Sequence, residues 1–125
     1  MNISHDKMRK FFEVAIKKTK DHSLLWKRAY YCKVPTSEIY DKERSFLSSY
    51  ARGNLLLAFN TLTAKPDCLI NPAPDLPYQL IGEDDIDVAG MVLRLYNVVY
   101  DTLPTIESFM DAVINSTDDP DNPLH

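Results

Sequence analysis

The residues that could form a nucleophile and base pair in this chain are two cysteines and one histidine. Cys32 and Cys68 are the only cysteines in the sequence, and His22 is the one histidine that does not lie near either end of the chain. Both cysteines lie within apolar patterns, where a thiol remains protonated and unreactive. We therefore expect both cysteines to be reduced and packed in the interior, and the sequence favours a protein that is not an enzyme.

Metal and phosphate chemistry also lack a suitable pattern. Glu83, Asp84, Asp85 and Asp87 could bind Mg²⁺ or Ca²⁺, but an acidic run before an apolar segment is typical of the start of a helix. The histidines, at positions 5, 22 and 125, do not have zinc-site spacing. The three glycines are too scattered for a phosphate-binding loop. We expect no cofactor.

Arg28 is the strongest candidate for a binding residue. In a strand over residues 24–34, it would share an apolar face with Trp26 and Tyr30. An arginine there needs a partner, which can be an internal carboxylate, an aromatic ring or an outside ligand. We predict a ligand-binding or partner-binding surface near these residues, with contributions from Arg52 and Tyr78.

Basic and aromatic residues alternate along the first half of the chain, an arrangement that could hold single-stranded nucleic acid. The sequence pI of 5.2 and the lack of an RNP or helix-turn-helix signature disfavour this interpretation. The residues concerned are Lys27, Arg28, Lys33, Lys42, Arg44 and Arg52, with Trp26, Tyr30, Tyr31, Tyr40 and Tyr50.

A helix pattern and a hairpin pattern in the first half of the chain indicate the elements that position these side chains. Residues 4–19 form an amphipathic helix pattern with Ser4 as its cap and Phe11 and Phe12 on its apolar stripe. Residues 45–61 favour a hairpin over a helix, because Gly53-Asn54 fits a type II′ turn. That turn would place Tyr50 opposite Leu57, with Leu47, Ala51, Leu56 and Ala58 on the other face.

The second half of the chain combines a proline-rich stretch with helices. The prolines of residues 66–77 exclude a helix there and allow short strands, such as one over residues 68–70. Residues 76–81 can add another short strand. Residues 88–100 are apolar nearly all round, which is typical of a central helix. Pro104 fits the first position of a last helix, whose apolar stripe comprises Ile106, Phe109, Met110, Val113 and Ile114.

Together these elements predict an α+β fold: a helix, a small antiparallel sheet, and two helices packed on it. An all-α domain is the alternative if 45–62 forms one helix. We expect one domain over residues 1–115 and a flexible acidic tail over 116–125, since 125 residues suit one core.

Composition narrows the function classes further. Twelve of the fourteen Lys and Arg residues lie in residues 1–62, and twelve of the eighteen acidic residues lie in 63–125. No apolar run is long enough to span a membrane, and a charged N-terminus does not fit a signal peptide, which predicts a cytoplasmic protein. The favoured function is a non-catalytic interaction domain that binds another protein or itself, for example as a homodimer. A small-ligand pocket or small enzyme is the alternative, and nucleic-acid binding is third.

Overall fold

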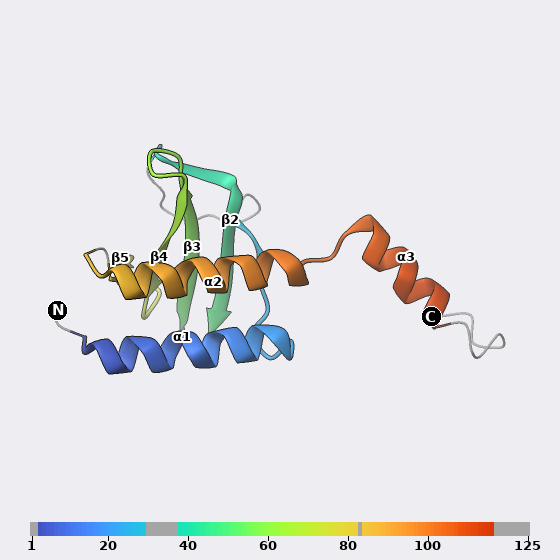
Figure 1. The fold of residues 1–125 in the computed structure, drawn as a ribbon, viewed down its shortest axis with the longest axis horizontal. Coiled ribbons are helices and arrows are strands. Elements are labelled where there is room, and N and C mark those ends of the chain that lie inside the picture. The colour runs from blue at the N-terminus through green and yellow to red at the C-terminus, as the bar shows by residue number, and fades with distance from the viewer. Residues whose placement is uncertain (1–2, 30–37, 83, 117–125) are drawn as a thin grey trace.

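A five-stranded antiparallel sheet with helices on one face forms the body of the protein (Figure 1). The computed structural model describes residues 3–29, 38–82 and 84–116. Strand order in the sheet follows the sequence, so each strand pairs with the next. The elements are α1 (His5–Lys20), β1 (Lys27–Arg28), β2 (Tyr40–Tyr50), β3 (Gly53–Asn60), β4 (Lys65–Asn71), β5 (Gln79–Leu80), α2 (Ile86–Thr102) and α3 (Ile106–Asn115). The predicted α+β class is confirmed.

Helices α1 and α2 lie side by side and share the main core with the sheet (Figure 1). The Ser4 side chain accepts a hydrogen bond from the Lys7 amide and caps α1, as predicted. Asp85 caps α2 in the same way. The core contains Phe12, Ala15 and Ile16 of α1, Phe46, Leu55, Leu57 and Cys68 of the strands, and Val88, Val92, Leu95, Tyr96 and Val99 of α2.

The predicted hairpin is present, but its register differs from the prediction. Tyr50 pairs with Gly53, not with Leu57, and the turn consists of Ala51 and Arg52. Ala51 takes the positive φ, at 54°, that was expected of Gly53. The shift is an even number of residues, so strand side chains keep their predicted faces. Leu47, Leu56 and Ala58 accordingly form a second cluster on the sheet face opposite α1 and α2.

Gly53 is required in this hairpin for another reason, which is close packing. A Cβ at this position would lie 2.6 Å from the main-chain oxygen of Asn71. The start of β3 therefore lies directly against the end of β4, and Pro72 follows at the same place. The residue preferences of turns carry no information about this close contact between strands. For this reason the turn was predicted at Gly53 and Asn54, two residues after its actual position at Ala51 and Arg52.

The short strands of the proline-rich stretch are also present. β4 contains the predicted segment 68–70, and β5 lies within 76–81. The predicted strand over 24–34 is seen only as the two residues of β1, and residues 30–34 lie outside the described residues. No helix among the described residues is long and apolar enough to cross a membrane.

Helix α3 does not pack on the sheet as predicted. It extends away from the body beyond the end of α2 (Figure 1), and it has no buried residue. Thr105 is its cap and exchanges hydrogen bonds with Ser108, so Pro104 precedes the cap and does not occupy the first helical position. Most of the predicted acidic tail, residues 117–125, lies outside the described residues.

Candidate functional site

Trp26 is held by α1 and packs against the main core. Its indole Nε1 donates a hydrogen bond to Thr19 Oγ1 at 3.0 Å, and Thr19 Oγ1 donates to the Ala15 carbonyl at 2.7 Å. The ring is partly buried beside the residues of the main core. These contacts give Trp26 a structural role, because its polar atom and much of its ring are already engaged.

Arg28 finds its partners within the protein. Its side chain is exposed, its Nη1 donates to the Glu43 carbonyl at 2.7 Å, and its guanidinium lies 5.6 Å from the centroid of the Phe46 ring. An aromatic ring was one of the expected partners, and a main-chain carbonyl takes the place of a carboxylate. Tyr78 packs on the second cluster, across the sheet from Trp26. Tyr30 lies outside the described residues.

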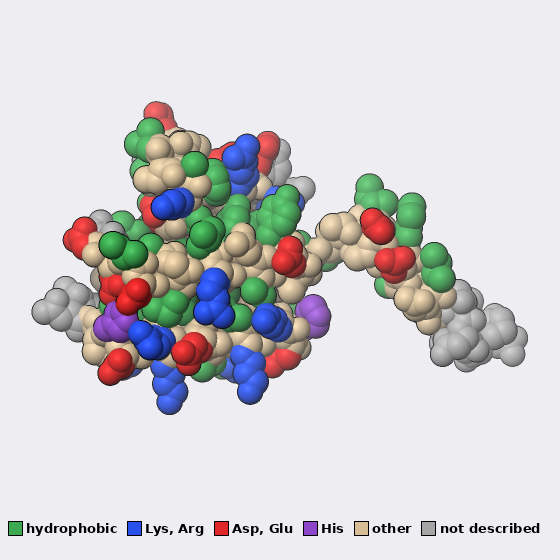
Figure 2. Space-filling view, viewed as in Figure 1, with side chains coloured by type: hydrophobic (Ala, Val, Ile, Leu, Met, Phe, Trp, Pro, Cys, Tyr) green, Lys and Arg blue, Asp and Glu red, His purple; other side chains and the backbone are tan. Residues whose placement is uncertain are grey.

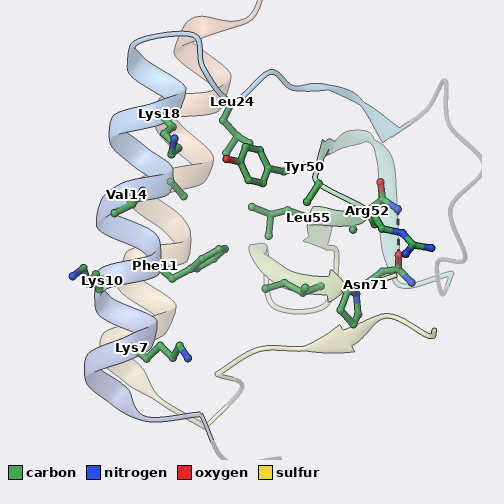
Figure 3. Close-up of a pocket in the computed structure, with 16 residues that line it drawn as sticks. Lys7, Lys10, Phe11, Val14, Lys18, Leu24, Tyr50, Arg52, Leu55 and Asn71 are labelled. Carbon is green, nitrogen blue, oxygen red and sulfur yellow. Dashed lines mark hydrogen bonds between the residues drawn. The ribbon is translucent and has the colours of Figure 1, made fainter. Parts of the chain in front are cut away.

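A groove of about 550 Å³ lies between α1 and the β2–β3 turn, and of the predicted binding residues that the structure describes, Arg52 alone lines it (Figure 3). One wall is α1, the opposite wall is the turn with Asn71 and Pro72, and apolar side chains form the floor. The lining residues are Lys7, Lys10, Phe11, Val14, Ala15, Lys18, Leu24, Tyr50, Ala51, Arg52, Gly53, Asn54, Leu55, Ile70, Asn71 and Pro72.

The groove has an apolar interior and a basic rim. Phe11, Val14 and Tyr50 are 37%, 41% and 63% exposed. Lys7, Lys10, Lys18 and Arg52 lie at the groove border, with the Lys10 and Arg52 side chains directed away from the interior (Figure 3), and the lining contributed by the described residues includes no carboxylate. Such a surface attracts a ligand that is apolar in its centre and negatively charged at its edges.

One contact between the two walls and two contacts within them give the groove a defined shape. The Lys18 ammonium of α1 lies 5.8 Å from the centroid of the Tyr50 ring on β2. Phe11 packs edge-on against buried Phe12, with ring centroids 5.0 Å apart. Within the wall opposite α1, Asn54 Nδ2 donates to Asn71 Oδ1 at 3.2 Å and ties β3 to β4 (Figure 3). The lining is therefore largely formed before any ligand arrives.

The groove wall on α1 is a second apolar stripe that the sequence prediction merged with the core. Phe11 was assigned to the core face with Phe12, yet Phe11 and Val14 lie on a neighbouring face together with Lys7 and Lys18. These positions recur at spacings of three and four residues. The sequence did contain a signal for this second stripe: the apolar positions of α1 cover more of the helix surface than packing against one core requires, and lysines flank them.

His5, Asp85 and Asp87 meet where the N-termini of α1 and α2 adjoin. His5 Nδ1 lies 2.9 Å from Asp85 Oδ2, and His5 Nε2 lies 3.7 Å from Asp87 Oδ2. The His5 hydrogen bond, with help from α2 amides, lowers the pKa of Asp85. One ligand atom from each residue lies within 4.8 Å of the others. The cap of α2 accounts for Asp85, in agreement with the helix-start interpretation.

Of the remaining sequence candidates for chemistry, Cys68 is buried, Arg44 contacts groups of its own chain, and His22 is exposed. Cys68 is 1% exposed, and burial raises the pKa of its thiol, which keeps it protonated. Cys32 lies outside the described residues. The Arg44 guanidinium, a candidate for contact with nucleic acid, lies 5.2 Å from the Phe59 ring centroid, and its Nε lies 3.4 Å from Asp41 Oδ2. These contacts hold the Arg44 guanidinium against groups of its own chain.

Comparisons with protein-family models, curated proteins and solved structures found no match.

Proposed function

We propose that the protein is a non-catalytic interaction domain whose groove binds an amphipathic helix with acidic side chains from a protein partner. The observation that carries this proposal is the combination of an apolar groove with a basic rim. Grooves of this kind receive the apolar face of a helix through side chains at positions i, i+3, i+4 and i+7. Acidic residues beside that face would lie in the positive field of the basic residues at the groove border.

The dimensions of the groove suit a short helix. Along α1 it extends from Lys7 to Lys18, a length of about 16 Å at a rise of about 1.5 Å per residue. A ligand helix with apolar side chains over two to three turns would cover that length. The exposed rings of Phe11 and Tyr50 provide large apolar contact areas on the two opposite walls.

A long-chain carboxylate is the competing ligand, because it too combines an apolar body with one negative group. The groove is open on the solvent side, where Val14 and Tyr50 remain exposed (Figure 3). An acyl chain there would keep much of its surface in water, whereas binding sites for small molecules usually enclose most of the ligand. An open wall favours a helix, which buries one face only.

The test uses a hydrocarbon-stapled helical peptide with leucines at i, i+3, i+4 and i+7 and glutamates beside them. We expect it to bind and to shift the backbone resonances of Phe11, Val14 and Tyr50. Val14→Asp should weaken binding by about tenfold or more, since it places a charge in the apolar centre. Leu62→Asp is the matched control, because Leu62 is 77% exposed and lies outside the groove lining.

Two further probes complete the experiment. A peptide with lysine in place of each glutamate should bind more weakly than the acidic peptide. Raising the salt concentration should weaken the binding of the acidic peptide and not that of the lysine peptide. Palmitate is tested in the same way. Binding of palmitate without binding of either peptide would assign the groove to acyl chains, and no binding by any probe would refute the proposal.

We also propose the cytoplasm as the compartment in which this binding takes place. Cys68 is a free and buried thiol, a state that reducing compartments preserve. Thiol titration of the protein purified under nonreducing conditions checks this, and we expect Cys32 and Cys68 both to react after unfolding. A disulfide between them would contradict the proposal.

A further inference from the structure

Helix α3 carries an apolar stripe that its own chain does not bury. Ile106, Phe109, Met110 and Val113 follow the spacing of one helix face, and they are 77%, 68%, 55% and 44% exposed. Figure 2 shows apolar side chains on the segment that projects from the body. A stripe of large apolar residues on a projecting helix is typical of a surface that binds a partner.

The charge of α3 complements the charge of the groove. Glu107 and Asp111 follow Ile106 and Met110 in the sequence and lie beside one edge of the apolar stripe. Arg94 is the last Lys or Arg in the sequence, so α3 and the residues after it contain acidic residues and no Lys or Arg. The groove rim has the opposite composition, with Lys7, Lys10, Lys18 and Arg52. The uneven distribution of charge along the sequence thus reappears as two oppositely charged surfaces.

The lengths of the two surfaces also agree. From Ile106 to Val113 the stripe spans about 10 Å at the rise of an α-helix. The groove wall from Lys7 to Lys18 is about 16 Å long, so it accommodates the whole stripe with lysines at both ends. Only residues 103–105 connect α2 to α3, and in the structure α3 points away from its own body (Figure 1). That direction presents the stripe to another molecule.

We infer that the groove binds α3 of a second copy of this chain. This inference rests on the proposed function and names its partner. Each copy has one groove and one α3, so two copies can exchange their α3 helices reciprocally and form a closed twofold dimer. In that dimer the apolar stripe of each α3 covers Phe11, Val14 and Tyr50 of the other copy.

The experiment uses two variants of the full-length chain, each with one damaged half of the contact. Val14→Asp damages the groove and leaves α3 intact, and Phe109→Asp damages α3 and leaves the groove intact. Both side chains are exposed, so neither change empties the core. By sedimentation velocity we expect a dimer for the unmodified chain and for Leu62→Asp, and a dimer dissociation constant raised about tenfold or more for each variant.

Mixing the two variants tests reciprocal exchange directly. The mixture contains one intact groove and one intact α3 per pair, so we expect a heterodimer to form from two monomeric variants. A mixture that stays monomeric, or an unmodified chain that is monomeric across the dilution series, overturns the inference. The second result includes the case in which α3 folds back into its own groove.

The stapled peptide separates failure of this inference from failure of the proposed function. If the mixture stays monomeric but the acidic peptide still binds Phe109→Asp through Val14, the groove binds helices of another protein and the self-docking inference alone is wrong. If the mixture stays monomeric and the acidic peptide does not bind, both the inference and the proposed function are wrong.

Discussion

Removal of α3 should leave the stability of the isolated protomer unchanged. The variant ends at Leu103, which is kept because it packs against the main core. A fully buried large apolar side chain contributes about 1.5–3 kcal/mol to stability, and α3 has no buried residue. We therefore expect the free energy of unfolding to change by less than about 0.5 kcal/mol at low protein concentration. Phe12→Ala, at a position with 0% exposure, should cost about 3–5 kcal/mol.

The stability of the full-length chain should depend on protein concentration, and the stability of the chain that ends at Leu103 should not. For a dimer in exchange with its monomer, each tenfold rise in concentration above the dissociation constant stabilises a protomer by about 0.7 kcal/mol. For a chain of this size that corresponds to a rise in Tm of about 2–4 °C. The full-length chain should show this rise, and the chain ending at Leu103 should not.

Urea unfolding followed by tryptophan fluorescence measures both effects, because Trp26 is the single tryptophan and bonds to Thr19 of α1. Matched dilution series of the two chains give the dependence on concentration. A loss of more than about 1 kcal/mol on truncation at low concentration would show that α3 supports its own body, and the reasoning from its exposure would be refuted.

Two further predictions concern the groove wall and the helix starts. Gly53→Ala should destabilise the protein by about 1–3 kcal/mol, because its Cβ would meet the Asn71 main chain. Gly90→Ala should instead stabilise the protein by about 0.5–1 kcal/mol, because the space around this position of α2 is open. Thermal denaturation of both variants checks that the two changes in stability have opposite signs. The lowered pKa of Asp85 means that its ionised form stabilises the fold above the ordinary value of 3.8, and that this contribution disappears as the pH falls through the folded value. Asp85→Asn can still cap α2 but carries no charge, so it should be less stable than the unmodified chain near neutral pH and equally stable in acid; a stability gap that persists in acid would contradict the pairing with His5.

Local patterns predicted most of the elements of this fold, because the signals lie within a few residues. Ser4 and the period of α1, the acidic start of α2, and the alternation in the hairpin all act over short distances. The hairpin register did not follow from these signals. It depends on the contact of Gly53 with Asn71, which is a contact between two strands that the turn sequence does not encode.

The groove could be predicted from the sequence only in part. Arg52 was named among the basic residues and does line the groove, but Trp26, Arg28 and Tyr78 are placed elsewhere by the packing of the sheet. An amphipathic pattern shows that a helix has an apolar face and does not show which surface covers it. For this reason the stripes of α1 and α3 were both assigned to the core, although each has exposed apolar members.

The short outer strands of the sheet restrict how this protein can associate. β1 and β5 are each two residues long, so each presents few main-chain hydrogen-bonding groups of its own. Long exposed borders recruit strands from other chains and can grow into fibrils. Two-residue strands such as β1 and β5 are poor templates for strand addition, and a reciprocal exchange of α3 is a route by which association closes at two copies.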